Sequence, residues 1–209
     1  MRAVPEPGPP PEDHYFTAEP ASADERRTMP VHLAGREVVV DTAPGIFSPG
    51  RLDLGTQVLL RSVPPPPPSG HLLDLGCGWG PVALTMALTS PEATVWAVDV
   101  NARALDLLRG TAGRLGLTNL RAVRPEEVPE VAFAALWSNP PIRIGKPALH
   151  AMLEQWLPRL EETASAHLVV QRNLGADSLQ RWIAERLGTE VDRIASAKGF
   201  RVLRVAAPR

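Results

Sequence analysis

The chain has very few of the residues that build cross-linked or membrane-spanning proteins. Its 209 residues include one cysteine, Cys77, and one tyrosine. A single cysteine excludes an internal disulfide framework and is typical of a reducing compartment, so we expect a cytoplasmic protein. No apolar run approaches the roughly 18 residues of a membrane span, and the N-terminus lacks the basic-then-apolar pattern of a secretory signal.

An excess of charge of one sign is also absent, because the formal net charge is -1. The charges are nevertheless unevenly placed. Residues 1–100 carry 6 Lys/Arg against 12 Asp/Glu, whereas residues 101–209 carry 16 against 11. The basic half could form a surface that binds RNA. Charge alone favours the simpler interpretation, in which these arginines lie on solvent-exposed helix faces. The five histidines show no metal-ligand spacing, so we expect no metal site.

Proline, in contrast, is abundant and marks the domain boundaries. Residues 1–13 are proline-rich and acidic, which predicts a disordered tail. Five consecutive prolines follow residue 63, and we assign residues 64–69 as a stiff polyproline linker. The linker separates an N-terminal segment, residues 14–63, from the main domain, residues 70–209. We expect the N-terminal segment to pack on that domain.

From residue 71 onward, the pattern alternates between strand and helix. Strands are expected at 71–75, 94–98, 120–123, 131–137 and 166–171, and helices at 81–88, 102–115, 148–160 and 176–187. Residues 190–195 and 200–206 read as a terminal antiparallel hairpin. The alternation predicts an α/β fold with a mostly parallel sheet, whose ligands bind at the carboxyl ends of the strands.

A glycine-rich loop, DLGCGWG at residues 74–80, follows the first of these strands. Glycines there allow a sharp turn and a close approach of the backbone to a ligand. Their two-residue spacing differs from the dinucleotide fingerprint, and an acid, Asp74, precedes them. The pattern favours a nucleoside with a cationic group over a pyrophosphate, although any tight strand–helix turn can collect glycines.

The next strand ends at Asp99, 25 residues after Asp74. A carboxylate at this place can accept hydrogen bonds from both ribose hydroxyls of an adenosine moiety. The alternative is an acid that only stabilises the N-terminus of the following helix, for which Asn101 is the expected cap. The glycine loop upstream favours the ligand-binding interpretation.

A third motif, Asn139-Pro140-Pro141, stands at the end of the fourth strand. Two prolines fix the backbone and remove two N–H donors, which leaves carbonyl oxygens and the Asn139 amide oxygen as acceptors. Two acceptors that converge on one amino group can orient its lone pair toward an electrophilic methyl group. An isolated motif of this kind would indicate an ordinary turn.

These motifs, in the order DLGCGWG, WAVD and SNPPIRIGK, resemble class I methyltransferases. The upstream block GIFSPGRLDLGTQ, residues 45–57, is similar to the "methyltransferase small" domain of bacterial 16S rRNA guanine-N2 methyltransferases of the short single-domain type. The resemblance implies a Rossmann-like class I fold with a mostly parallel seven-stranded sheet. It also implies S-adenosylmethionine as methyl donor, and ribosomal RNA or the small ribosomal subunit as the partner that is methylated on a guanine amine.

The resemblance also implies which residues form the site. The expected catalytic residues are Asn139, Pro140 and Pro141. The expected donor-binding residues are Asp74, Gly76, Cys77, Gly78, Asp99, Val100, Glu126 and Asn139. The expected substrate-binding residues are Phe47, Ile142, Arg143 and Lys146.

The chain departs from the family pattern after the NPP motif. Ile142 stands where amino-methyltransferases often carry an aromatic residue that stacks on the target base, so stacking must come from Phe47, Tyr15 or Arg143. The acid that often contacts adenine has no clear equivalent, and Glu126 is a candidate for it. Other amine acceptors stay open: a protein glutamine, a DNA adenine or a small amine. A catalytically silent RNA-binding domain is the remaining alternative.

Overall fold

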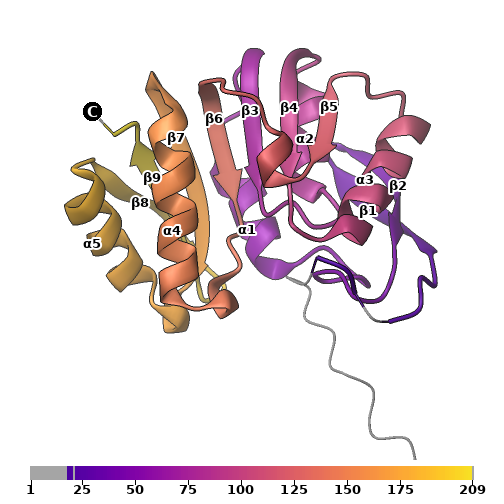
Figure 1. The fold of residues 1–209 in the computed structure, drawn as a ribbon, viewed down its shortest axis with the longest axis horizontal. Helices are drawn as coiled ribbons and strands as arrows, with labels where there is room; N and C mark the ends of the chain where they lie inside the picture. The colour runs from indigo at the N-terminus through magenta and orange to yellow at the C-terminus, as the bar shows by residue number, and fades with distance from the viewer. Residues whose placement is uncertain (1–17, 21, 209) are drawn as a thin grey trace, which may run out of the picture.

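The computed structural model describes residues 18–20 and 22–208, so the predicted tail at residues 1–13 and Tyr15 lie outside the described residues. A single seven-stranded sheet with the strand order β5-β4-β3-β6-β7-β9-β8 forms the centre (Figure 1). Its strands are β3 Ser69–Leu75, β4 Glu92–Val98, β5 Leu120–Val123, β6 Phe133–Ser138, β7 Leu160–Gln171, β8 Val191–Ala197 and β9 Phe200–Ala206. The predicted α/β class and strand number are confirmed.

The direction of winding reverses between β3 and β6. The strands β3, β4 and β5 run parallel toward one edge, and β6 then pairs with the opposite side of β3. β9 pairs antiparallel with both β7 and β8, as the predicted terminal hairpin requires. A reversal point of this kind opens a crevice at the carboxyl ends of the strands, which lie along the lower edge of the sheet in Figure 1.

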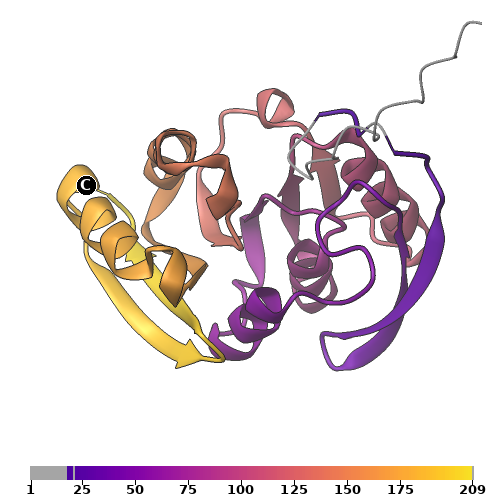
Figure 2. The ribbon, with the colours of Figure 1, turned by 90° about the horizontal axis from the view of Figure 1, so that it is seen from below.

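Helices cover both faces of the sheet (Figures 1 and 2). One face carries α1 Leu54–Ser62, α2 Pro81–Thr89 and α3 Ala102–Arg114, and the other carries α4 Lys146–Trp156 and α5 Ala176–Leu187. Neighbouring strand residues serve opposite layers, because Leu72 packs with the first group and Leu73 with the second. No helix in the described part of the chain is long and apolar enough to cross a membrane.

The N-terminal segment contains elements that were not expected from the sequence. Strands β1 Arg27–Leu33 and β2 Arg36–Thr42 form an antiparallel hairpin, and α1 follows. The β-branched run Val38-Val39-Val40 was the signal available in the sequence, and in β2 the side chains of Val38 and Val40 are buried whereas Val39 is exposed. The hairpin packs on α3, whose Arg103 donates hydrogen bonds to the backbone oxygens of Pro44, Pro20 and Ser22.

Most bounds lie within two residues of the prediction, and those of two elements differ by more. Helix α4 begins at Lys146 rather than at residue 148, because Gly145 (φ +93°) turns the chain and Pro147 fits the first turn. The helix ends at Trp156, where Pro158 forces a short 3-10 turn. Strand β7 therefore starts at Leu160, six residues earlier than expected, with an irregular register opposite the start of β6.

Candidate active site

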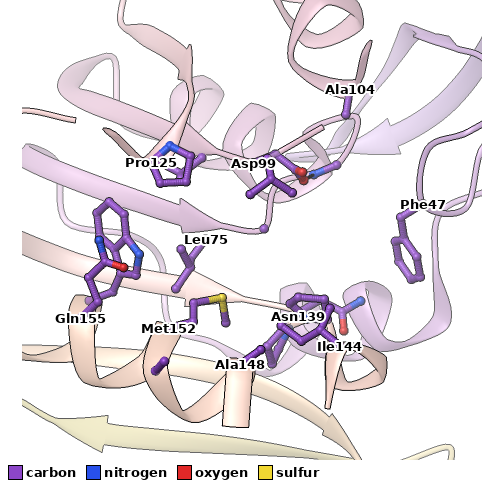
Figure 3. A pocket seen from close by; sticks show the side chains of 18 residues that line it. Phe47, Leu75, Asp99, Ala104, Pro125, Asn139, Ile144, Ala148, Met152 and Gln155 are labelled. Atoms are coloured by element: carbon purple, nitrogen blue, oxygen red, sulfur yellow. Dashed lines mark hydrogen bonds between the residues drawn. The ribbon is translucent and has the colours of Figure 1, made fainter. Parts of the chain in front are cut away.

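The main cleft lies at the carboxyl ends of the strands, where the winding reverses. Its volume is about 550 Å³, and Figure 3 shows its lining. Pro125 and Gln155 stand at one end, whereas Asn139 and Phe47 stand at the other, with Asp99 between them. The lining comes from the loops after β3, β4, β5 and β6, from the segment before α1, and from one face of α4.

The glycine loop after β3 is a tight backbone turn. The N–H groups of Gly76 and Cys77 both donate to the carbonyl oxygen of Val98, at 2.8 and 3.0 Å. Gly78 has φ +54°, and a Cβ added to Gly80 would lie 2.3 Å from the side chain of Leu108. Only glycine fits these positions without strain. Gly76 and Gly78 line the cleft.

Asp99, at the end of β4, fastens the glycine loop to the next helix. One carboxylate oxygen accepts the N–H of Gly78 at 2.8 Å, and the other accepts the N–H of Asn101 at 2.9 Å. Burial raises the pKa of Asp99, and these backbone donors oppose the rise. An ionised carboxylate has about four acceptor positions, so each oxygen can still accept a ligand hydroxyl. Asn101 caps α3 as predicted, through the N–H of Ala104.

Asp74 is a second carboxyl group beneath the loop. It is 1% exposed, and it accepts the N–H of Ala83 in the first turn of α2 at 2.9 Å. Burial raises its pKa to about 8; the backbone donor lowers the pKa, and the negative charge of Asp99 raises it further. Asp74 and Cys77 line a small recess that shares Gly76, Gly78 and Asn139 with the main cleft. Two buried carboxyl groups of this kind favour a cationic ligand.

The side chain of Asn139 is held in one orientation. Its amide nitrogen donates to the Oδ2 atom of Asp53 at 2.9 Å and to the hydroxyl oxygen of Thr56 at 3.1 Å. An ionised carboxylate can only accept hydrogen bonds, so the amide NH2 group must face Asp53. The amide oxygen of Asn139 is therefore turned away from Asp53 and stays available as an acceptor.

The two prolines after Asn139 bring further carbonyl oxygens to the cleft. The carbonyl of Pro140 accepts the N–H of Ile142 at 2.8 Å. A carbonyl oxygen has two lone pairs, so one acceptor position of Pro140 is left over. The buried hydroxyl of Ser138 donates to the carbonyl of Leu75 at 2.6 Å, which ties this loop to the glycine loop.

The structure brings most of the predicted site residues together, but not all of them. Phe47 and Val100 line the main cleft with the glycine loop, Asp99 and the NPP motif. Glu126 is exposed on the short 3-10 helix after β5 and does not line the cleft, whereas its neighbour Pro125 does. Ile142 and Lys146 line a second cavity instead of the main cleft. The exposed Arg143, which lies between them in the sequence, lines neither.

Two residues that orient Asn139 were missed as site residues by the sequence analysis. Asp53 accepts the N–H of Thr56 at 3.1 Å and so caps α1, and both side chains meet Asn139 more than 80 residues along the chain. An Asp three residues before a Thr at the start of a helix indicates a cap. Nothing in that local pattern points to a distant asparagine.

This geometry agrees with comparisons to known proteins. The model of the methyltransferase small domain matches residues 37–204. The chain belongs to this family. Membership, together with the sheet order, confirms the class I methyltransferase fold and S-adenosylmethionine as the methyl donor that the sequence predicted.

Relatives of this family differ in how much of their length they share with the chain. The uncharacterized protein YbxB of Bacillus subtilis is 30% identical over 92% of this chain and 97% of its own length. The ribosomal RNA small subunit methyltransferase C of Aeromonas hydrophila is 37% identical over 66% of this chain, but the match spans only 39% of that enzyme.

A solved structure has the same fold. The T. thermophilus 16S rRNA N2 methyltransferase RsmC, in complex with AdoMet and guanosine, superimposes with a TM-score of 0.76. It is 22% identical, and the match covers 90% of this chain and 52% of that chain. The chain thus spans about half of this methyltransferase.

Proposed function

We propose that this protein transfers a methyl group from S-adenosylmethionine to the exocyclic amine of a guanine in small-subunit ribosomal RNA. The observation that carries the proposal is the fixed Asn139 amide, whose oxygen is left available beside the carbonyl of Pro140. The names of the related rRNA methyltransferases and the guanosine in the T. thermophilus complex support a guanine acceptor.

The residues on the other side of the cleft fit the donor. Asp99 has acceptor positions for the two ribose hydroxyls, and the glycine loop brings backbone close to the ligand. Val100 and Pro125 offer apolar contacts for the adenine ring. Asp99 supplies negative charge near a ligand that carries a sulfonium and an ammonium group, and Asp74, with a pKa of about 8, adds to it once the cationic ligand favours its ionised form. The donor supplies an electrophilic methyl group.

On the acceptor side, the protein acts by positioning. The Asn139 amide oxygen and the Pro140 carbonyl each accept one N–H bond of the target amine. These two bonds turn the nitrogen lone pair toward the methyl group and draw it out of conjugation with the base. The carbon–nitrogen bond forms as the carbon–sulfur bond breaks. The methylated nitrogen then releases one proton to solvent.

The target base has to reach this end of the cleft. A guanine amine inside a duplex is out of reach, so the base must be unpaired or flipped. Phe47 lines the cleft beside Asn139 and is the aromatic side chain on which the base stacks in this proposal (Figure 3). Ile142 stands at the sequence position where amino-methyltransferases often carry an aromatic residue, but its side chain lines the second cavity.

The test is transfer of a tritiated methyl group to purified small ribosomal subunits and to free 16S RNA. Digestion of the RNA and mass spectrometry should identify N2-methylguanosine. Parallel reactions should offer a glutamine-containing protein or peptide, DNA and small amines. Label in any of these acceptors but not in RNA would refute the proposal, and binding of the donor without transfer to any acceptor would indicate a silent domain.

A further inference from the structure

A second cavity opens beside the catalytic loop, between the first turns of α4 and α5. Its volume is about 220 Å³. Ile142 and Lys146 connect it to the NPP loop, and Gly175 and Ser178 belong to the start of α5. This volume lies below the usual range for a drug-sized ligand and is less than half that of the main cleft, which suits a single ring system.

The walls of this cavity are largely apolar, with one aromatic pair. The imidazole of His150 on α4 stacks on the indole of Trp182 on α5, with ring centroids 3.6 Å apart and planes 10° apart. Leu149, Val170 and Leu179 supply further apolar surface. Flat aromatic and apolar walls of this kind can stack against the face of any of the four nucleobases.

Four cations belong to the chain segments that border the cavity or contact those segments. Lys146 lines it directly, and Arg143 lies in the turn between Ile142 and Lys146. Arg172 starts the 3-10 turn that leads into Gly175, and its backbone N–H donates to the carbonyl of Gly199, beside Lys198. We call Arg143, Lys146, Arg172 and Lys198 the cationic rim.

The four rim side chains have no internal partner among the described residues, as is also true of some other exposed arginines. Within residues 18–20 and 22–208, none of its four side chains makes an ion pair or a side-chain hydrogen bond. Some exposed cations elsewhere in the protein are paired, as in Arg114–Asp41 and Arg186–Glu154. The nearby acid Asp177 is itself paired with Arg201.

Acids are also absent from two of the three chain segments that carry the rim. Residues 139–153 and 193–201 contain Arg and Lys but no Asp or Glu. On the donor side of the cleft, the loop after β5 carries Glu126, Glu127 and Glu130 against a single Arg124. The positive potential is therefore concentrated beside the acceptor end of the cleft, where a polyanion would approach.

We propose that the second cavity and the cationic rim bind the RNA strand next to the target guanine. One neighbouring base enters the cavity, and the flanking phosphates lie on the rim. This subsite rests on the proposed function, because it assumes that the acceptor is an RNA base in the main cleft. In this proposal, the residues that bind the neighbouring RNA strand are different from those that position the target amine.

The rim is tested by Lys146→Ala/Arg172→Ala, with Arg36→Ala/Arg61→Ala as a control of equal charge change. Arg36 and Arg61 are exposed, at the start of β2 and in the last turn of α1, and neither forms an ion pair with any residue that the structure describes. The probe is a fluorescently labelled single-stranded RNA of about 12 nucleotides with one guanine. Its binding is followed by anisotropy over a range of salt concentrations.

The rim variant should bind this RNA roughly tenfold more weakly than the control. Its slope of log K against log salt should fall by about 1.4, because each lost phosphate contact on a single strand contributes roughly 0.7. In methyl transfer, its KM for RNA should rise while kcat at saturating RNA stays the same. Donor affinity by calorimetry should also stay the same.

The cavity is tested by Ser178→Leu, which fills it without a change of charge, with Ser178→Ala as the matched control. The leucine variant should bind RNA several-fold more weakly than the alanine variant, with an unchanged salt slope. Melting temperatures of both variants check the fold. RNA affinity equal to the matched control, in either the rim or the cavity variant, would overturn the proposal.

The same experiments separate this subsite from the proposed function. Normal RNA methylation with control-like affinity in the rim and cavity variants would remove the subsite and leave the function. Rim-dependent RNA binding without any RNA methylation by the unmodified protein would support the subsite and refute the function. Failure of the unmodified protein to bind RNA would overturn both.

Discussion

The two halves of the cleft are built in different ways. The donor half consists of short motifs whose parts lie close in sequence, and Asp99 fastens them through the backbone N–H groups of Gly78 and Asn101. The acceptor half depends on a contact between Asn139 and Asp53, which are 86 residues apart. A donor site can thus be recognised from local pattern, whereas the orientation of the acceptor site is a product of the tertiary fold.

The two halves also differ in charge. The donor half contains two buried carboxyl groups whose pKa values are raised by burial, and the acceptor half is bordered by the cationic rim. A cationic donor and an anionic RNA strand would each meet the opposite charge. The comparison predicts that substitutions in one half change one affinity and leave the other affinity almost unchanged.

The largest effect is expected from Asn139→Ala. It removes one of the two acceptors for the target amine, and loss of a preorganised polar contact typically slows a reaction by roughly a hundredfold or more. Donor affinity should stay within a few fold. Methyl transfer to ribosomal subunits and calorimetry on the same variant measure the two effects. Transfer at the unmodified rate would show that Asn139 does not hold the acceptor.

The next effect is expected in the donor half. Asp99→Ala should weaken donor binding by about 2 kcal/mol, or roughly thirtyfold in Kd, because charged hydrogen bonds to the ligand are lost. The variant also leaves the N–H groups of Gly78 and Asn101 without their acceptor. Affinity for single-stranded RNA should not change. An unaltered donor Kd in calorimetry would place Asp99 outside the donor site.

A smaller effect should come from the residue that orients Asn139. Asp53→Ser keeps a hydroxyl that can cap α1 but is too short to reach the Asn139 amide, so kcat should fall about tenfold. The donor Kd and the melting temperature should hardly change. Combined with Asn139→Ala, the substitution should add nothing, because Asp53 acts through Asn139. Additive losses in kcat would instead mean that Asp53 supports the fold alone.

The smallest effect is a dependence of donor affinity on pH. Asp74 has a pKa of about 8 in the free protein, and a cationic ligand favours its ionised form. Donor affinity should therefore rise with pH by a few fold and level off above about pH 8, with protons released on binding. Calorimetry in buffers of different ionisation enthalpy measures the release. In Asp74→Asn the rise should be weaker, and an equally steep rise would exclude Asp74 as its source.

The same raised pKa has a consequence for stability. A carboxyl group with a higher pKa in the folded state stabilises the fold fully below its unfolded pKa, roughly 3.9, and loses this contribution as the pH rises through about 8. Denaturant unfolding of the ligand-free protein should thus show a decline over this range. The decline should be smaller in Asp74→Asn.

Much of the fold and of the donor half could be predicted from the chain. Strand–helix alternation, the glycine loop and Asp99 are local patterns, and the structure reproduces the resulting sheet and its terminal hairpin. Glu126 was a weaker inference, since it rested on the resemblance alone, and the turn after β5 leaves this side chain exposed while Pro125 meets the cleft.

The sequence by itself determined the family, the α/β architecture and the positions of the glycine loop and the NPP motif, because each is encoded by residues within a few positions of one another. Only the tertiary structure decided that Asp53 and Thr56 fix the Asn139 amide, and that Ile142 and Lys146 belong to a second cavity. The physical reason is that hydrogen-bond direction and cavity walls depend on where separate elements pack. That placement is set by the burial of side chains across the whole sheet.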